Sequence, residues 1–241
     1  MIYGIISDIH ANLEALNAVL ARCEELGVEQ YICVGDLVGY NANPSECLEI
    51  VRSLPLAAVV KGNHDEQASE NLDLSEFNPQ AAKAIEWTRD QLSQEQRDYL
   101  RDLPMKARVG RITVVHATLD NPGMWGYIMD KYAAEASLSY QFSQVCFYGH
   151  SHVPMAFDRQ MDVEMMESGV IEVLPGHKYL INPGSVGQPR DKDPRASFAT
   201  YDTDECIIKL HRLEYDIETT QKKIIEAGLP ERLAQRLSLG Y

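Results

Sequence analysis

The residues best suited to chemistry are aspartates, histidines and one asparagine, each placed just after a short apolar run. The set comprises Asp8, His10, Asp36, Asn63, His116, His150 and His152. Oxygen and nitrogen donors without cysteine form a ligand set that suits manganese, iron, zinc and similar first-row ions. Seven ligands exceed what one such ion takes. Two ions about 3.5 to 4 Å apart that share one carboxylate would use them all.

Taken alone, each stretch has an ordinary structural alternative. Asp8 could cap a helix, and His116 or His64 could be a hydrogen-bonded structural histidine. Asn63 and Asp65 could be turn residues. Because these alternatives require a separate coincidence at each of five positions along the chain, a shared metal site is the more economical interpretation.

The elements that must position these residues are short buried strands rich in β-branched and aromatic side chains. We expect such strands at residues 2–6, 31–34, 58–60, 112–115 and 145–148. In α/β proteins the binding site lies at the carboxyl ends of the strands. We therefore expect the polar residues after these five strands to form one site. We further expect the pairs Asp8/His10 and His150/His152 to share a face, because side chains two apart do so in an extended segment.

Helices are expected between and after these strands. Leucines recur at helical spacing after Asn12, a suitable N-cap, and Gly27 is a suitable stop. Further helices are expected at 44–54, at 78–103 with a break near Ser93, at 131–142, at 217–227 and after Pro230. Alternating strands and helices favour βαβ units and a largely parallel sheet in the front half.

The back half is richer in strands. A hairpin is expected over 105–116, and further strands at 155–157, 169–174, 178–181, 196–202 and 205–215. The fold class is therefore α/β (α+β), with two packed sheets covered by helices. The sequence shows neither an internal repeat nor linker composition, so residues 1–241 are expected to form a single domain.

Charge and composition exclude several classes of partner. Lys and Arg total 22 against 36 Asp and Glu, and no basic block could follow the backbone of a long nucleic acid. A small phosphorylated substrate is compatible, because bound divalent ions reverse the local sign of the field. The sequence has no leader-like start and no apolar run of about 20 residues. We expect no membrane association, and a cytoplasmic location.

The five cysteines are widely separated and never in a Cys-x-x-Cys spacing, which argues against a disulfide framework and a thiolate zinc site.

In combination, these motifs resemble the calcineurin-like metallophosphoesterases. The resemblance spans residues 2 to about 202 and rests on the motifs Asp8-x-His10, Gly35-Asp36, Gly62-Asn63-His64-Asp65, His116 and Gly149-His150-x-His152. It implies a four-layer α-β-β-α sandwich, with two mixed sheets flanked by helices. It further implies that Asp36 bridges two ions. One ion would be held by Asp8, His10 and His152, and the other by Asn63, His116 and His150.

The resemblance also implies an activity: hydrolysis of a small phosphomonoester or phosphodiester, nucleotides included, by a metal-bridging hydroxide. Two divalent ions would be the cofactors, manganese first, with iron, zinc, nickel or cobalt as alternatives. His64 would act as general acid or as hydrogen-bond donor to the leaving oxygen, and Asp65 would orient or charge His64.

Two features bear on the subclass. Protein Ser/Thr phosphatases of this superfamily carry an arginine shortly after the bridging aspartate and a glutamate at the end of the third motif. Here Leu37 follows Asp36, and the third motif ends in Asp65, so phosphoprotein substrates are less expected. Residues 181–190 and 194–196 resemble small bacterial and archaeal phosphodiesterases, including those grouped with diadenosine polyphosphatases.

Several assignments stay open at this point. Asn12 could hold a phosphate oxygen or cap a helix, and Arg190 could touch phosphate or pair with a neighbouring aspartate. Trp125 and Tyr127 could stack on a nucleobase, form a dimer contact or pack in the core. The competing function is a noncatalytic metal-binding scaffold of the same fold. Intact His64 argues against it, because such relatives lose this histidine.

Overall fold

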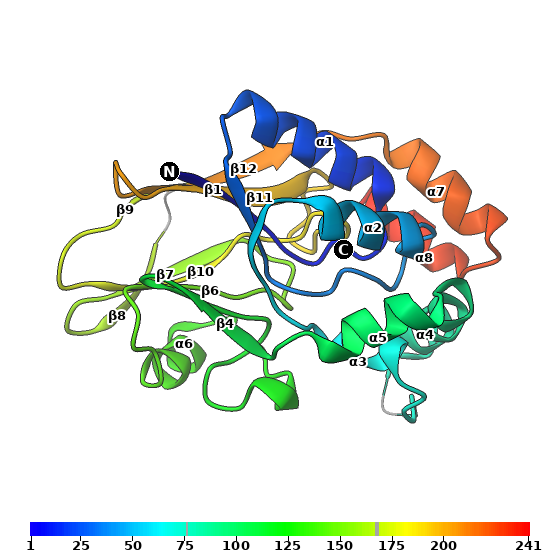
Figure 1. Ribbon diagram of the computed structural model, residues 1–241, viewed down its shortest axis with the longest axis horizontal. Coiled ribbons are helices and arrows are strands. Elements are labelled where there is room, and N and C mark those ends of the chain that lie inside the picture. The colour runs from blue at the N-terminus through cyan, green and yellow to red at the C-terminus, as the bar shows by residue number, and fades with distance from the viewer. Residues whose placement is uncertain (76, 167–168) are drawn as a thin grey trace.

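The structure is a computed structural model that describes residues 1–75, 77–166 and 169–241, and these residues form two six-stranded sheets (Figure 1). The first sheet has the order β3-β2-β1-β11-β12-β9, and the second the order β4-β5-β6-β10-β7-β8. The first contains β1 (Ile2–Ile6), β2 (Gln30–Cys33), β3 (Leu56–Val59), β9 (Val170–Glu172), β11 (Ala196–Asp202) and β12 (Ile207–Leu213). The second contains β4 (Lys106–Val109), β5 (Ile112–Val115), β6 (Val145–Phe147), β7 (Met155–Arg159), β8 (Val163–Met166) and β10 (Lys178–Asn182).

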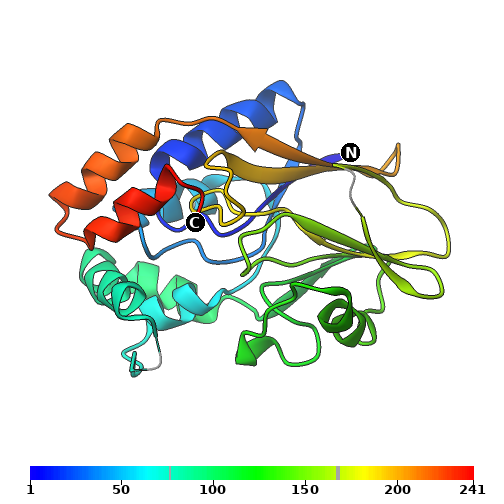
Figure 2. The ribbon, with the colours of Figure 1, turned by 180° about the vertical axis from the view of Figure 1, so that it is seen from behind.

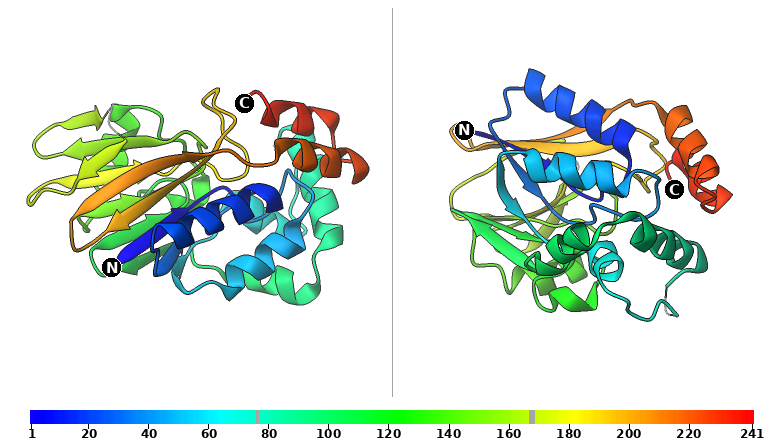
Figure 3. Two further views of the ribbon diagram at one scale, coloured as in Figure 1. Left: turned by 90° about the horizontal axis from the view of Figure 1, so that it is seen from above. Right: turned by 45° about the vertical axis from the view of Figure 1, so that its right-hand side comes forward.

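Helices lie on the outer sides of the two sheets. Figure 3 shows α1 and α2 over the first sheet, and α6 lies against the second (Figure 1). The helices are α1 (Leu13–Glu25), α2 (Pro44–Ser53), α3 (Asn63–Ser69), α4 (Pro79–Gln91), α5 (Gln94–Asp102), α6 (Lys131–Leu138), α7 (Ile217–Glu226) and α8 (Glu231–Leu237). Within the described ranges, no helix is long and apolar enough to cross a membrane.

Alternating side chains along the strands separate the layers. In β1, Ile5 packs into the core between the two sheets, whereas Ile6 packs against the helices of the first sheet. In the second sheet, Phe147 faces the inter-sheet core and Cys146 faces the cluster that includes α6. Successive residues of a strand point to opposite faces, so each buried strand serves two cores. The expected four-layer α-β-β-α sandwich with two mixed sheets is confirmed.

Parallel pairing brings the strand ends of interest to one edge. β1 pairs in parallel with β2, and β2 with β3, while β6 pairs in parallel with β5 and β10. The segments that follow β1, β2, β3, β5 and β6 carry the seven predicted ligands. The carboxyl ends of parallel strands meet at a common edge, which places those segments together.

Several elements differ from the expectation. Residues 63–69 form α3 where only a turn was expected, and β8 at 163–166 was not predicted. The helix expected over 131–142 ends at Leu138. The break near Ser93 is confirmed, because Ser93 and Gln96 form a reciprocal capping box between α4 and α5.

The loop before β11 is held directly on the segment that follows β1. The N–H groups of Val186 and Gly187 donate to the carbonyls of Ser7 and Asp8, at 2.9 and 3.0 Å. A Cβ atom at Gly187 would lie 1.8 Å from the carbonyl oxygen of Ile9. Glycine is therefore required at 187 for this close approach.

We expect Gly187→Ala to lower the free energy of unfolding by about 1–3 kcal/mol, because the new methyl group overlaps a fixed backbone oxygen. Chemical denaturation measures the change. Gly123→Ala is the matched control, since its Cβ would meet only a methionine methyl at an ordinary 3.7 Å. Equal stability of the two variants would contradict the close approach.

Candidate metal centre

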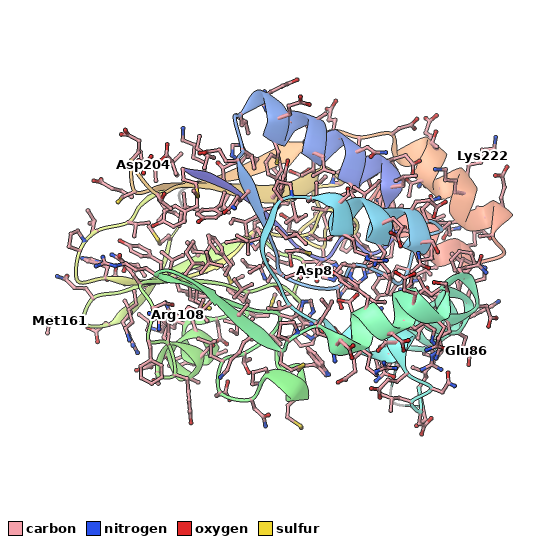
Figure 4. The ribbon with its side chains drawn as sticks, viewed as in Figure 1. Asp8, Glu86, Arg108, Met161, Asp204 and Lys222 are labelled. Carbon is pink, nitrogen blue, oxygen red and sulfur yellow. The ribbon has the colours of Figure 1, made fainter. Side chains whose placement is uncertain are left out.

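All seven predicted ligands are buried and converge at the edge where the strand ends meet. Figure 4 labels Asp8 near the middle of the molecule, between the sheets and the helices. Asp8, His10, Asp36 and His152 place ligand atoms within 4.8 Å of one another, and so do Asp36, His116 and His150. Asp36 belongs to both groups. The structure thus brings together the histidines and carboxylates of the predicted set as two adjoining clusters with one shared carboxylate.

The backbone that carries these ligands is not extended. Left-handed φ angles of 48–67° occur at Asp8, His10, Asp36, His150 and His152. Non-glycine residues rarely adopt this conformation, and strained backbone of this kind gathers at functional sites. The expectation that ligands two apart share a face because their segment is extended is therefore wrong. Instead, tight turns after the strands direct the side chains inward.

Backbone carbonyls fix the orientation of three histidine rings. The Nδ1 atoms of His10, His116 and His152 donate to the carbonyls of Val38, Val34 and Gln188, at 2.9, 2.8 and 2.6 Å respectively. A carbonyl only accepts hydrogen bonds, so each Nδ1 carries a proton and Nε2 is the nitrogen that each ring presents to the site, with a free lone pair whenever the ring is neutral. This is the tautomer that a metal ligand needs.

The Nε2 atoms of two histidines face one another. Those of His10 and His152 lie 3.0 Å apart. With both Nδ1 atoms protonated, two lone pairs meet unless a cation or an extra proton lies between the rings. Asp36 Oδ2 lies 3.4 Å from His10 Nε2 and 3.3 Å from His116 Nε2, so the shared carboxylate faces both clusters.

Unpartnered buried atoms supply a test of whether a metal would fit. Asp36 Oδ2, Asn63 Oδ1 and His150 Nε2 are buried and accept no hydrogen bond from the described residues. A buried polar atom without a partner costs about 1–3 kcal/mol, so native structures normally provide one. Divalent ions at the two clusters would satisfy these acceptors. The donor set therefore fits a metal.

Burial and the charge of Asp36 shift the pKa values of the histidines in the site. Burial lowers the pKa of His150 to about 3 and holds those of His10 and His152 well below the usual range. Although burial opposes it, the charge of Asp36 raises the pKa of His116 to about 9. Most of the histidines are thus neutral, as metal ligands must be.

His64 extends from the first turn of α3 beside the two clusters. The backbone N–H of His64 donates to Asp36 Oδ1 at 2.8 Å. The centroid of the His64 ring lies 4.7 Å from that of His10 and 4.4 Å from that of Tyr40. Burial lowers the pKa of His64 to about 4. The ring lines a cavity of about 290 Å³ that also borders Asp36 and His150. A ligand in this cavity would therefore contact His64 and the candidate metal centre together.

Asp65 has a different environment from the one expected. Its carboxylate accepts from the N–H groups of Asp36, Leu37 and Gly62, at 2.8, 2.8 and 3.0 Å. His64 Nδ1 has no hydrogen-bond partner among the described residues. The expectation that Asp65 orients or charges the His64 ring through direct contact is therefore wrong. Asp65 instead fixes the turn that presents Asp36.

The structure shows which protein groups Asn12 and Arg190 contact. Asn12 Oδ1 caps α1 through the N–H of Ala15 at 3.1 Å, and Asn12 Nδ2 donates to the carbonyl of Gly187. Helix capping therefore accounts for Asn12. Arg190 pairs with neither neighbouring aspartate, because Asp191 forms an ion pair with Arg212 and Asp193 forms one with Arg195. Arg190 lines the cavity instead.

Four aromatic residues border the same cavity, namely Tyr40, Phe77, Trp125 and Tyr127. Trp125 Nε1 donates to Glu66 at 3.3 Å, and the ring of Tyr127 stacks on His150 with 4.2 Å between centroids. Tyr40 was not singled out from the sequence, yet it packs on His10 and His64. In the sequence, Tyr40 is marked only by its position shortly after Asp36, in a segment rich in turn residues. That position does not indicate that the ring borders a site.

We expect Asp65→Asn to lower the free energy of unfolding by about 1–3 kcal/mol, because an amide NH₂ would face backbone N–H donors that now have an acceptor. Thermal or chemical denaturation of the purified chain measures this. Asp204→Asn, at an exposed position, is the control. A variant as stable as the control would show that the amide contacts are unimportant.

Comparison with known proteins places this geometry in a family. The model of the calcineurin-like phosphoesterase superfamily domain matches residues 1–206. An uncharacterized protein of Methanocaldococcus jannaschii is 39% identical over 98% of this chain and 97% of its own length. A metallophosphoesterase from Sphaerobacter thermophilus superposes with a TM-score of 0.89 at 42% identity, covering 100% of this chain and 99% of its own. A hypothetical protein from Pyrococcus horikoshii shares the fold, with a TM-score of 0.82 at 23% identity over 100% and 98% of the two chains. The chain belongs to the calcineurin-like phosphoesterase superfamily.

Proposed function

We propose that the chain is a dinuclear metal-dependent phosphoesterase that hydrolyses a small phosphomonoester or phosphodiester. The observation that carries the proposal is Asp36, the one carboxylate common to two adjoining buried ligand clusters. Family membership supports a metal-dependent phosphoesterase. The buried acceptors without partners support the metals. The cavity beside the clusters supports a small substrate.

The ligands divide into two sets in this proposal. Asp8, His10 and His152 would hold one ion, Asn63, His116 and His150 the other, and Asp36 both. When bound, the ions supply an acidified water as nucleophile and neutralise the phosphoryl oxygens. Manganese is the first candidate because the oxygen and nitrogen ligands suit it, with iron, zinc, nickel or cobalt as alternatives.

The protein's own groups would position the ester and help the leaving oxygen depart. His64 lines the cavity beside Asp36 and His150, within reach of a phosphate held at the clusters. As an imidazole it can donate a hydrogen bond or a proton to the leaving oxygen. Burial of the ligands excludes bulk water from the reacting region. A noncatalytic scaffold is the weaker alternative, because it leaves the placement of His64 in the cavity unexplained.

We expect His64→Ala to retain its metals and to lose about 10² to 10⁴-fold in turnover, because the donor to the leaving oxygen is removed. The assay is hydrolysis of p-nitrophenyl phosphate and bis-p-nitrophenyl phosphate with manganese. Metal analysis of the same preparation is the control. Undiminished turnover would remove His64 from the mechanism, and inactivity of the wild type toward these esters and a nucleotide panel would favour the scaffold.

We expect Asp36→Ala to lower the metal content toward zero, whereas His116→Ala keeps the ion held by the other set. The reason is that Asp36 is shared and His116 belongs to one cluster. Elemental analysis after dialysis against manganese gives the ions bound per chain. The proposal of a shared carboxylate fails if the two variants lose the same amount of metal.

A further inference from the structure

Three arginines line a second pocket that adjoins the cavity of the candidate metal centre. Arg190 lies in the loop before β11, and Arg232 and Arg236 lie on α8. The pocket has a volume of about 340 Å³. It shares with the metal-centre cavity the residues Tyr40, Asn78, Ala81, Tyr127 and Arg190. The two spaces are therefore continuous, and a single elongated ligand could occupy both.

Contacts between distant parts of the chain build this pocket. Figure 2 shows the end of α8 beside the loop that precedes β11. The N–H of Lys192 donates to the carbonyl of Gly240 at 2.9 Å. Arg190 donates to Tyr40 Oη at 3.2 Å and to Gln188 Oε1 at 2.9 Å, so its guanidinium is held between the two spaces.

Side-chain carboxylates do not neutralise the positive charge of the pocket in the described part of the chain. Arg195, Arg212 and Arg22 each pair with a carboxylate. Within the ranges that the structure describes, no aspartate or glutamate lies within ion-pair distance of the three pocket arginines, and none lines the pocket. This is unusual in a chain with 36 acidic and 22 basic residues.

The arginines also retain free donors. Arg190 Nε is buried without a hydrogen-bond partner in the described part of the chain. Arg236 donates its Nε to a main-chain carboxylate oxygen of Tyr241, the last residue of the sequence, and its two terminal nitrogens have no hydrogen-bond partner among the described residues. Burial and the neighbouring charges of Arg190 and Arg232 lower the pKa of Arg236 to about 10, so the group stays cationic at neutral pH. Like charges that act on one another in this way favour the binding of an anion.

We propose that Arg190, Arg232 and Arg236 bind a second phosphate group of the substrate, which makes the preferred substrates molecules with two or more phosphates. This inference rests on the proposed function, in which the first phosphate lies at the metal centre. Guanidinium groups bind phosphate oxygens in bidentate fashion, and three of them converge here. The aromatic rings of Tyr40 and Tyr127 border the passage between the two phosphate positions.

The test compares inorganic tripolyphosphate with orthophosphate as inhibitors of p-nitrophenyl phosphate hydrolysis, with free manganese buffered at a constant level. The ratio of the two inhibition constants isolates the contribution of the additional phosphates. We expect wild type to bind tripolyphosphate at least about tenfold more tightly, and the double variant Arg232→Gln/Arg236→Gln to lose most of that preference. Equal affinities in wild type, or an unchanged ratio in the double variant, would overturn the proposal.

Two further variants test whether a change in the ratio comes from lost phosphate binding, from altered folding or from the loss of any positive charge. The side chain of Arg232 is exposed and makes no hydrogen bond or ion pair within the described residues, so Arg232→Gln alone should fold normally and must also lower the ratio. Arg22→Gln removes the same charge on α1, where Arg22 pairs with Glu25, and should keep the wild-type ratio. If wild type hydrolyses no ester, the proposed function fails. Calorimetry of both phosphates with the manganese-loaded chain then still measures the ratio.

Discussion

The constraint on which the structure depends is the burial of many polar ligand atoms at one edge of two packed sheets. Two carboxylates, four imidazoles and an amide are buried, and several of their acceptor atoms have no partner in the described chain. Desolvation of such groups is unfavourable unless opposite charge compensates it. The shared carboxylate, Asp36, faces imidazoles of both clusters, and cations bound between these groups would stabilise the arrangement. The apolar layers around it supply the remaining free energy of folding.

Residues that bind no metal hold this arrangement in place. Backbone carbonyls accept hydrogen bonds from three histidine rings, and the Asp65 carboxylate accepts hydrogen bonds from the backbone N–H groups of Asp36 and Leu37. Supporting contacts of this kind set the tautomer and the direction of each ligand, so that little rearrangement is needed when an ion binds. The ligand turns use left-handed backbone at non-glycine positions, which only a well-packed environment maintains. Stability of the fold and competence of the site therefore depend on the same contacts.

The sequence predicted the layers and the ligand set because both leave local signals. Buried strands such as 145–147 appear as short apolar runs, and polar residues that follow them mark the strand ends. The short helix α3 was missed because it begins within the metal motif at Asn63, where turn residues conceal a helix start. The role of Asp65 depends on amides 28 and 29 residues away, which no spacing reveals. The arginine pocket joins α8 to a loop some 40 residues earlier in the chain, and only the folded structure brings them together.

The distribution of charge reconciles an acidic chain with an anionic substrate. A net charge of −14 repels polyanions at a distance, which disfavours long nucleic acids as partners. Near the candidate metal centre we expect the sign to be reversed, because the buried ligands would hold cations and the adjoining pocket contributes three arginines with no aspartate or glutamate partner in the described chain. Screening limits the field of exposed charges to about 8 Å in physiological salt, so a small substrate inside the cavity would respond to the local charges and not to the surface. In the proposed function, attraction would thus be confined to molecules small enough to enter the cavity, and the three arginines would extend it beyond a single phosphate.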